Sequence, residues 1–384
     1  MDEIKTLFAL FRYELFGLKL CDEIKNSITD EMLLSLYKIS KKHDLAHLIA
    51  DALDRNGLWT ENNEIKSRFL KERNMAVFRC EQLRFECEQI CDCLETAKIE
   101  FLPLKGTILR DYYPQFWMRT SCDIDVLVRE CDLEKTILVL QKELGYTLGE
   151  RGGHDVHLFA ASGVHLELHF SLVENENKWE EALESIWENT ISLSEYKRGL
   201  TSEIFYLYHI VHMAVHMRIG GCGVKPLLDI WIIKKNWEFN RPVVETMLES
   251  CGLLTFEQKI NKLANVWLEN EKMDDISAAL QSYILYGGVY GNTQNRVAVQ
   301  QVKKGGKVSY LSSRIFISFD ELATKYPTLK KQKWLFPFFQ LYRWIDLLFH
   351  KEKRDKAMNT VKQTYATTEG KLSKTEELFD EIGI

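Results

Sequence analysis

The stretch IEFLPLKGTILRDYYPQFWMRTSCDIDVLV, residues 99–128, decides the fold. It opens with an apolar run, breaks at Lys105-Gly106-Thr107, and ends in a run that alternates aspartate with apolar residues. Such alternation predicts a β-strand, in which successive side chains point to opposite faces. Asp123 and Asp125 should therefore share one face. Two carboxylates this close indicate a site for a hard cation such as Mg²⁺, although an edge strand with two surface aspartates would give the same pattern.

A second alternating segment, residues 164–170, supplies a third carboxylate. Its valine, leucines and phenylalanine would face the core, and His165, Glu167 and His169 would share the opposite face. Three acids from two strands, after a glycine break, are the pattern of a two-metal site. In such a site, paired cations neutralise the attacking and leaving oxygens of an in-line displacement.

These motifs resemble the DNA polymerase beta-like nucleotidyltransferase superfamily, whose members carry a small-residue turn, a strand with two alternating aspartates and a later strand with one acid. The closer pattern, L-K-G…Y…R-x-x-x-D-I-D-x-L-V, is similar to a bacterial nucleotidyltransferase family. An H-x-x-H-x-x-x-H helix followed by L-x-D also resembles that family. The likeness covers residues 95–235 and continues more weakly at 326–343. The superfamily usually places Gly-Ser where this chain has Gly106-Thr107, and threonine keeps the hydroxyl.

The resemblance implies transfer of a nucleoside monophosphate from an NTP to an acceptor hydroxyl, with release of pyrophosphate. The implied catalytic residues and ligands of two Mg²⁺ ions are Asp123, Asp125 and Glu167. Glu167 would also help to take the acceptor's proton. The implied nucleotide-binding residues lie in and beside the turn: Lys105, Gly106, Thr107 and Arg119. The candidates for the acceptor pocket are His212, His216 and Asp229.

The histidines allow more than one interpretation. His209, His212 and His216 share a helical face, which would line an acceptor pocket, bind zinc with further ligands, or belong to the core. His154 and His157 precede the Glu167 strand and would line the nucleotide site or act as structural residues.

Composition limits the class of protein. The chain has 384 residues, 28% of them charged, and a net charge of −6. A mildly acidic chain argues against broad nucleic-acid binding, apart from a local basic patch at 303–307. The sequence contains neither a recognisable secretory signal nor a run of about 20 apolar residues, so we expect a cytoplasmic protein without a membrane span. The nine cysteines lack paired C-x-x-C motifs and should be free thiols.

The expected architecture is α+β: a small mixed-sheet, polymerase beta-like core flanked by helical regions. The expected domains are an N-terminal helical region at 1–98, a nucleotidyltransferase core at 99–200 and a C-terminal helical region at 201–384. Within the last, 303–314 should form an exposed turn or hairpin, and 351–384 should fray or form a detached helix.

Two other functions remain open at this point. The chain would be a non-catalytic nucleotide-binding or regulatory module, or an antitoxin-type enzyme that adenylylates a partner protein. The expected partners are an NTP and an unidentified acceptor, which would be a small molecule, a sugar or a protein.

Overall fold

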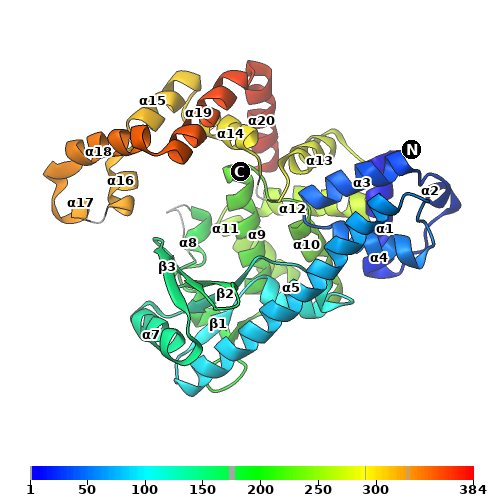
Figure 1. Cartoon of the computed structure of the whole chain (residues 1–384), viewed down its shortest axis with the longest axis horizontal. Coiled ribbons are helices and arrows are strands. Elements are labelled where there is room, and N and C mark those ends of the chain that lie inside the picture. The colour runs from blue at the N-terminus through cyan, green and yellow to red at the C-terminus, as the bar shows by residue number, and fades with distance from the viewer. Residues whose placement is uncertain (1, 173–177, 290, 327) are drawn as a thin grey trace. The chain divides into compact units, whose positions relative to one another are not determined.

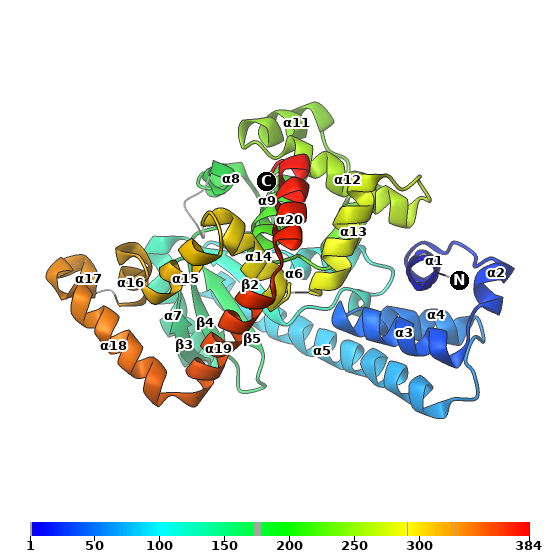
Figure 2. The same cartoon turned by 90° about the horizontal axis from the view of Figure 1, so that it is seen from above.

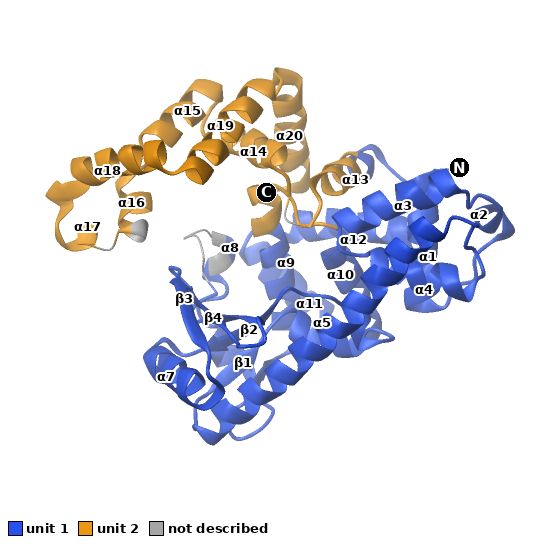
Figure 3. Cartoon of the chain, in the orientation of Figure 1, with its two compact units in different colours: residues 1–214, 224–278 blue, residues 215–223, 279–384 orange. Residues whose placement is uncertain are grey.

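The computed structural model describes residues 2–172, 178–289, 291–326 and 328–384. The chain divides into two compact units, of which unit 1 holds residues 1–214 and 224–278 and unit 2 holds residues 215–223 and 279–384 (Figure 3). The domain boundaries after residues 98 and 200 stay a prediction.

A five-stranded mixed sheet in unit 1 carries the motif segments. Its strands are β1 (Phe101–Pro103), β2 (Asp123–Val128), β3 (Thr147–Arg151), β4 (Asp155–Phe159) and β5 (His165–His169), in the order β1-β2-β5-β4-β3 (Figure 1). β2 and β5 run parallel, and the other neighbouring pairs are antiparallel. The predicted α+β class and the predicted adjacency of the Asp123 and Glu167 strands are therefore confirmed.

Two helices cover the apolar face of this sheet. They are α5 (Asn63–Thr96) and α7 (Leu133–Leu144), which lie along the same face in both views (Figures 1 and 2). The sheet contributes buried residues from alternate positions: Ile124, Val126, Val128, Val156, Leu158, Leu166 and Leu168. The helices contribute Leu83, Cys87, Ile90, Leu94, Leu133, Ile137 and Leu140. Because side chains alternate along a strand, the acids and histidines lie on the opposite face.

Local sequence explains where these helices begin and end. The side chain of Asn62 caps α5 by accepting a hydrogen bond from the Ile65 N–H at 3.2 Å. α7 ends at Gly145, whose φ of 70° lies in the left-handed region that glycine adopts without strain. None of the nine cysteines, all of which lie in the described residues, forms a disulfide bond, as expected.

Unit 1 also contains helices that precede and follow the sheet in the sequence, together with one short hairpin. The first group is α1 (Glu3–Phe16), α2 (Asp22–Asn26), α3 (Asp30–Lys42) and α4 (Ala46–Arg55). The hairpin pairs β6 (Thr190–Ser192) with β7 (Arg198–Leu200). The other helices are α8 (Lys178–Glu181), α9 (Ser202–Ile219), α10 (Lys225–Asn236), α11 (Arg241–Ser250), α12 (Leu254–Leu268) and α13 (Asp275–Gly287), of which α9 and α13 extend beyond the unit's residues.

Unit 2 corrects two predictions about the C-terminal region. Its helices are α14 (Thr293–Lys303), α15 (Lys307–Ile315), α16 (Phe319–Lys325), α17 (Thr328–Lys331), α18 (Phe336–Phe349), α19 (Lys351–Ala366) and α20 (Glu369–Ile382). The predicted hairpin at 303–314 is wrong, because the Gly305-Gly306 pair only separates two helices. The predicted frayed tail is also wrong, because α20 packs against α14 and buries Leu378, Phe379 and Ile382. Within the described ranges, no helix has the length and apolarity that crossing a membrane requires.

Candidate active site

The pairing of β2 with β5 places the predicted acids on one face of the sheet. Asp125 lies directly opposite Glu167, and Asp123 lies opposite His165. Ligand atoms of Asp125, Glu167 and His169 all lie within 4.8 Å of one another. Among the described residues, Asp123 joins no such group of three, although it occupies the same face one strand step away. The parallel register thus brings two of the three predicted acids together, with a histidine beside them.

Asp125 is the best-connected of these acids. Its Oδ1 accepts a hydrogen bond from Lys105 Nζ at 2.8 Å and lies 3.0 Å from Nε2 of His169. Asp125 is only 5% exposed and His169 only 3%. The other ring nitrogen of His169, Nδ1, has no hydrogen-bond partner among the described residues. The alternation of 164–170 places His169 on this face, but local sequence does not indicate its contact with Asp125.

The charges on this face are unevenly balanced. Burial raises the pKa of Glu167 to about 8, and the negative charges of Asp125 and Asp123 add to the shift. Burial and then Asp125 also raise the pKa of Asp123. Burial acts on Asp125 in the same direction, but Lys105 and His169 outweigh it and hold the pKa of Asp125 below its usual range. One lysine therefore stabilises the Asp125 carboxylate, whereas burial and neighbouring negative charge favour the protonated forms of Asp123 and Glu167.

In the turn after β1, the backbone of Lys105 is strained. Lys105 has φ 48° and ψ −121°, a left-handed conformation that side chains other than glycine rarely adopt. Gly106 has no positive φ, and a Cβ at that position would meet Arg119 Nη1 at 3.5 Å, an ordinary contact. The residue with a positive φ in this turn is thus Lys105 and not the glycine. A short helix follows the turn, α6 (Gly106–Leu109), and a 3₁₀ turn at Arg110–Tyr112 comes next.

We expect Lys105→Gly to be more stable than Lys105→Ala by about 1 kcal/mol, the reverse of the usual order of these two residues. Both substitutions remove the ammonium group beside Asp125, so their difference reports on the backbone alone. Urea unfolding of the two variants measures it. An alanine variant as stable as the glycine variant would show that Lys105 is not strained.

Arg119 and Asp229 form a buried ion pair. Nε of Arg119 lies 2.8 Å from Oδ1 and 3.0 Å from Oδ2 of Asp229, and Tyr113 donates its hydroxyl hydrogen to Oδ1 at 2.7 Å. The Asp229 side chain is fully buried. Burial disfavours the Arg119 cation, but Asp229 outweighs this effect and raises the pKa of Arg119. The pair joins α10 to the segment that leads into β2, with the Arg119 guanidinium beside Gly106.

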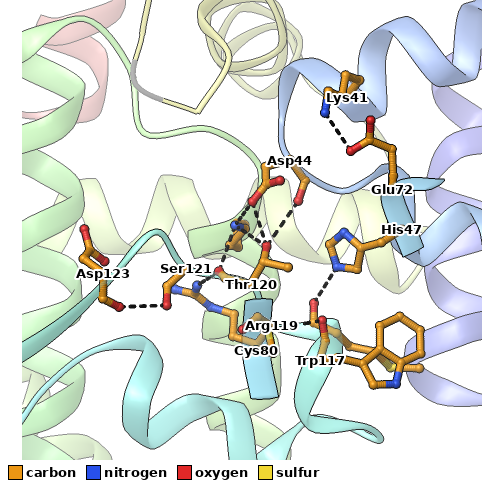
Figure 4. Close-up of polar contacts among 12 residues, drawn as sticks. Lys41, Asp44, His47, Glu72, Cys80, Trp117, Arg119, Thr120, Ser121 and Asp123 are labelled. Carbon is orange, nitrogen blue, oxygen red and sulfur yellow. Dashed lines mark hydrogen bonds and ion pairs between the residues drawn. The ribbon is translucent and has the colours of Figure 1, made fainter. Parts of the chain in front are cut away.

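A second ion pair, which is partly buried, holds the next residue of that segment. Lys225 donates to Asp44 Oδ2 at 3.0 Å and to Thr120 Oγ1 at 2.8 Å, and the Thr120 hydroxyl donates to Asp44 at 2.8 Å. Figure 4 shows Asp44 and His47 meeting this segment from one side, with Ser121 donating to the backbone oxygen of Asp123 at 3.0 Å. Local sequence does not indicate these contacts, because residues 44, 120 and 225 lie far apart in the chain. They fix the path of the backbone just before Asp123.

Comparison with known protein families supplies the deciding observation. A family described as an uncharacterised nucleotidyltransferase matches residues 32–269, more than half of the chain. The chain belongs to this nucleotidyltransferase family. Comparison with curated proteins and with solved structures gave no match. The family assigns the chain a general role in nucleotidyl transfer, and its match includes every residue of the candidate site described above.

Two further groups of histidines lie within the family match. His154 and His157 flank Asp155 on the polar side of β4, with ring nitrogens 3.6 and 3.7 Å from its Oδ2. The predicted stripe of His209, His212 and His216 lies on α9, and Nε2 of His209 is 3.0 Å from the backbone oxygen of Pro226. The roles of His212, His216 and Asp229 in an acceptor pocket stay predictions, and so do the roles of the turn residues in nucleotide binding.

We expect His47 to make the protein less stable as the pH falls from 7 to 5. Burial lowers the pKa of His47 to about 4, whereas an unfolded histidine has a pKa of about 6.5. The folded state therefore binds fewer protons than the unfolded state in this range, and the free energy of unfolding falls by about 2 kcal/mol. Urea unfolding of the wild type and of His47→Gln checks this: the stability difference between them should shrink by that amount, and a difference independent of pH would contradict it.

Proposed function

We propose that the chain is an active enzyme that transfers a nucleoside monophosphate from an NTP to an acceptor hydroxyl and releases pyrophosphate. One observation carries the proposal: the parallel register of β2 and β5 sets Asp125 opposite Glu167, with the Lys105 ammonium 2.8 Å from Asp125. A carboxylate pair with an adjacent cation, next to a strained turn, suits the handling of a charged triphosphate.

The donor set fits a hard divalent cation. Asp123, Asp125 and Glu167 would hold Mg²⁺, because carboxylate oxygens are the ligands that it prefers and because the pairing of β2 with β5 sets these three carboxylates on one face of the sheet. When bound, Mg²⁺ neutralises the charge that develops on the phosphate oxygens during transfer. His169 would keep Asp125 oriented through their 3.0 Å contact.

The residues of the turn would handle the triphosphate. Lys105 neutralises Asp125 in the free protein, and its ammonium group would interact with the phosphates once a cation is held by the acids. Arg119 is fixed by Asp229 through Nε, and its guanidinium lies against Gly106, where it would add a second positive charge. Gly106 and Thr107 would contact phosphate through the backbone and the hydroxyl. Glu167, on the strand opposite Asp125, would take the proton of the attacking hydroxyl.

A labelling screen tests this proposal. The purified chain is incubated with each NTP labelled at the α-phosphate, with Mg²⁺ and a cell extract, and is assayed for labelled product and for released pyrophosphate. We expect both to require Mg²⁺. Glu143→Gln, which removes an exposed carboxylate on α7, is the matched control and should retain full activity.

Other outcomes of the screen favour the alternatives. Mg²⁺-dependent nucleotide binding without any product would favour a non-catalytic module. Label on a single protein of the extract would favour adenylylation of a partner protein, and label on a small molecule or sugar would identify that class as the acceptor.

A further inference from the structure

The polar face of the sheet carries a second cluster of metal-ligating side chains beside the acids. His157 on β4 lies directly opposite Glu167 on β5, and His165 lies two residues before Glu167 on the same face. Ligand atoms of these three residues all lie within 4.8 Å of one another. The nucleotidyl-transfer proposal uses Glu167 but assigns nothing to the two histidines.

The two imidazoles are close enough to hold one ion between them. His157 Nδ1 lies 2.7 Å from His165 Nε2, and the two ring planes differ by 8°. Two nitrogens bound to one tetrahedral Zn²⁺ lie about 3.3 Å apart, given Zn–N distances of about 2.0–2.1 Å. A small rotation of either ring supplies the difference. Both side chains are partly exposed, so an ion in solvent can reach them.

Neighbouring residues hold both rings in place. The Phe159 ring stacks on His165 with centroids 4.9 Å apart, and it lies over Gly149, where a Cβ would come within 2.7 Å of the ring. On the other side, Oδ2 of Asp155 lies 3.7 Å from His157 Nε2, the ring nitrogen that faces away from His165. A carboxylate on the far nitrogen is the usual companion of a metal-binding imidazole.

The buried Asp155 is itself accommodated by a glycine. A Cβ at Gly152 would lie 2.0 Å from Oδ1 of Asp155, so only glycine leaves room for this carboxylate. Gly149 and Gly152 thus leave space for Phe159 and Asp155, the two side chains beside the histidine pair.

We propose that His157, His165 and Glu167 form a second cation site that binds a borderline divalent ion such as Zn²⁺ in preference to Mg²⁺. Two imidazoles and one carboxylate are a frequent ligand set for zinc and for non-haem iron, and imidazole is a poor ligand for Mg²⁺. Three ligands leave a coordination position for water or substrate. Glu167 is common to this site and to the Asp125 group, so the two sites adjoin. The inference does not depend on nucleotidyl transfer, because binding is measured without nucleotide.

The test is a titration of the metal-free full-length chain with Co²⁺, a spectroscopic substitute for Zn²⁺. We expect one equivalent to bind with visible absorption bands, to be displaced by Zn²⁺, and to resist millimolar Mg²⁺. His157→Ala and His165→Ala should each weaken Co²⁺ binding about tenfold or more. His350→Ala, which removes an exposed histidine of α18's C-terminal end, should bind as the wild type does. Asp125→Asn should keep the Co²⁺ site even if it abolishes nucleotidyl transfer. The failure of this proposal can therefore be distinguished from the failure of the nucleotidyl-transfer proposal.

Several results would overturn the proposal. They are a wild type that binds no Co²⁺, histidine variants that bind it unchanged, or an Asp125→Asn variant that loses it. Loss of Co²⁺ binding in His154→Ala, with Co²⁺ binding retained in His157→Ala, would overturn it as well. That result would place the ion at the neighbouring group of His154, Asp155 and His169. Far-UV circular dichroism of each metal-free variant verifies folding, and His157→Gln and His165→Gln replace any alanine variant that does not fold.

Discussion

Asp125→Asn should abolish nucleotidyl transfer while the protein stays folded. The amide is almost isosteric with the carboxylate and its oxygen can still accept the hydrogen bond from Lys105, which is 2.8 Å away in the wild type. It is, however, a far poorer ligand for a hard cation, and loss of that stabilisation should lower turnover by about a thousandfold or more. Steady-state rates with saturating NTP and Mg²⁺ measure the loss.

Two comparisons make this result specific. Glu143→Gln removes one negative charge from an exposed site and should leave the rate unchanged. Circular dichroism and thermal unfolding should show a cooperative, folded Asp125→Asn protein. Full Mg²⁺-dependent turnover by this variant would mean that Asp125 has no part in catalysis.

Asp229→Asn should lower the free energy of unfolding by about 3–5 kcal/mol. The substitution leaves Arg119 buried without a counter-charge, and it weakens the 2.7 Å hydrogen bond that Tyr113 donates to Asp229. Urea unfolding measures the change. Glu64→Gln, which breaks an exposed pair with Arg68, is the control and should cost less than about 1 kcal/mol.

A double-mutant cycle separates the ion pair from other effects of the substitution. Arg119→Met removes the buried cation, so adding Asp229→Asn to it should cost much less than in the wild type. Equal costs in the two backgrounds would show that Arg119 and Asp229 do not stabilise each other.

Much of the sheet could be predicted from local patterns. Alternation in 123–128 and 164–170 is a period of two, which identifies both the strands and their buried faces. The helices α5 and α7 were equally readable, because their apolar periodicity is long and their ends carry capping residues. The adjacency of the acids followed from the resemblance, since alternation alone does not state which strands pair.

The parts that escaped prediction depend on contacts between distant residues. Nothing near Asp44 indicates that it pairs with Lys225, 181 positions later. Glycine adopts a positive φ without strain, but in this turn the fold imposes that angle on Lys105, the residue before Gly106. In unit 2, the glycine pair at 305–306 is typical of an exposed turn or hairpin, although two glycines interrupt a helical region equally well.

The most direct test of the central claim follows the two ends of one nucleotide. The chain is given the same NTP labelled at either the α- or the γ-phosphate, with Mg²⁺ and an extract that contains an acceptor. We predict that the α-label appears on the acceptor and that the γ-label leaves as pyrophosphate, with neither event in Asp125→Asn. Transfer of the γ-label to the acceptor, or equal α-label transfer by Asp125→Asn, would contradict nucleotidyl transfer at the face shared by β2 and β5.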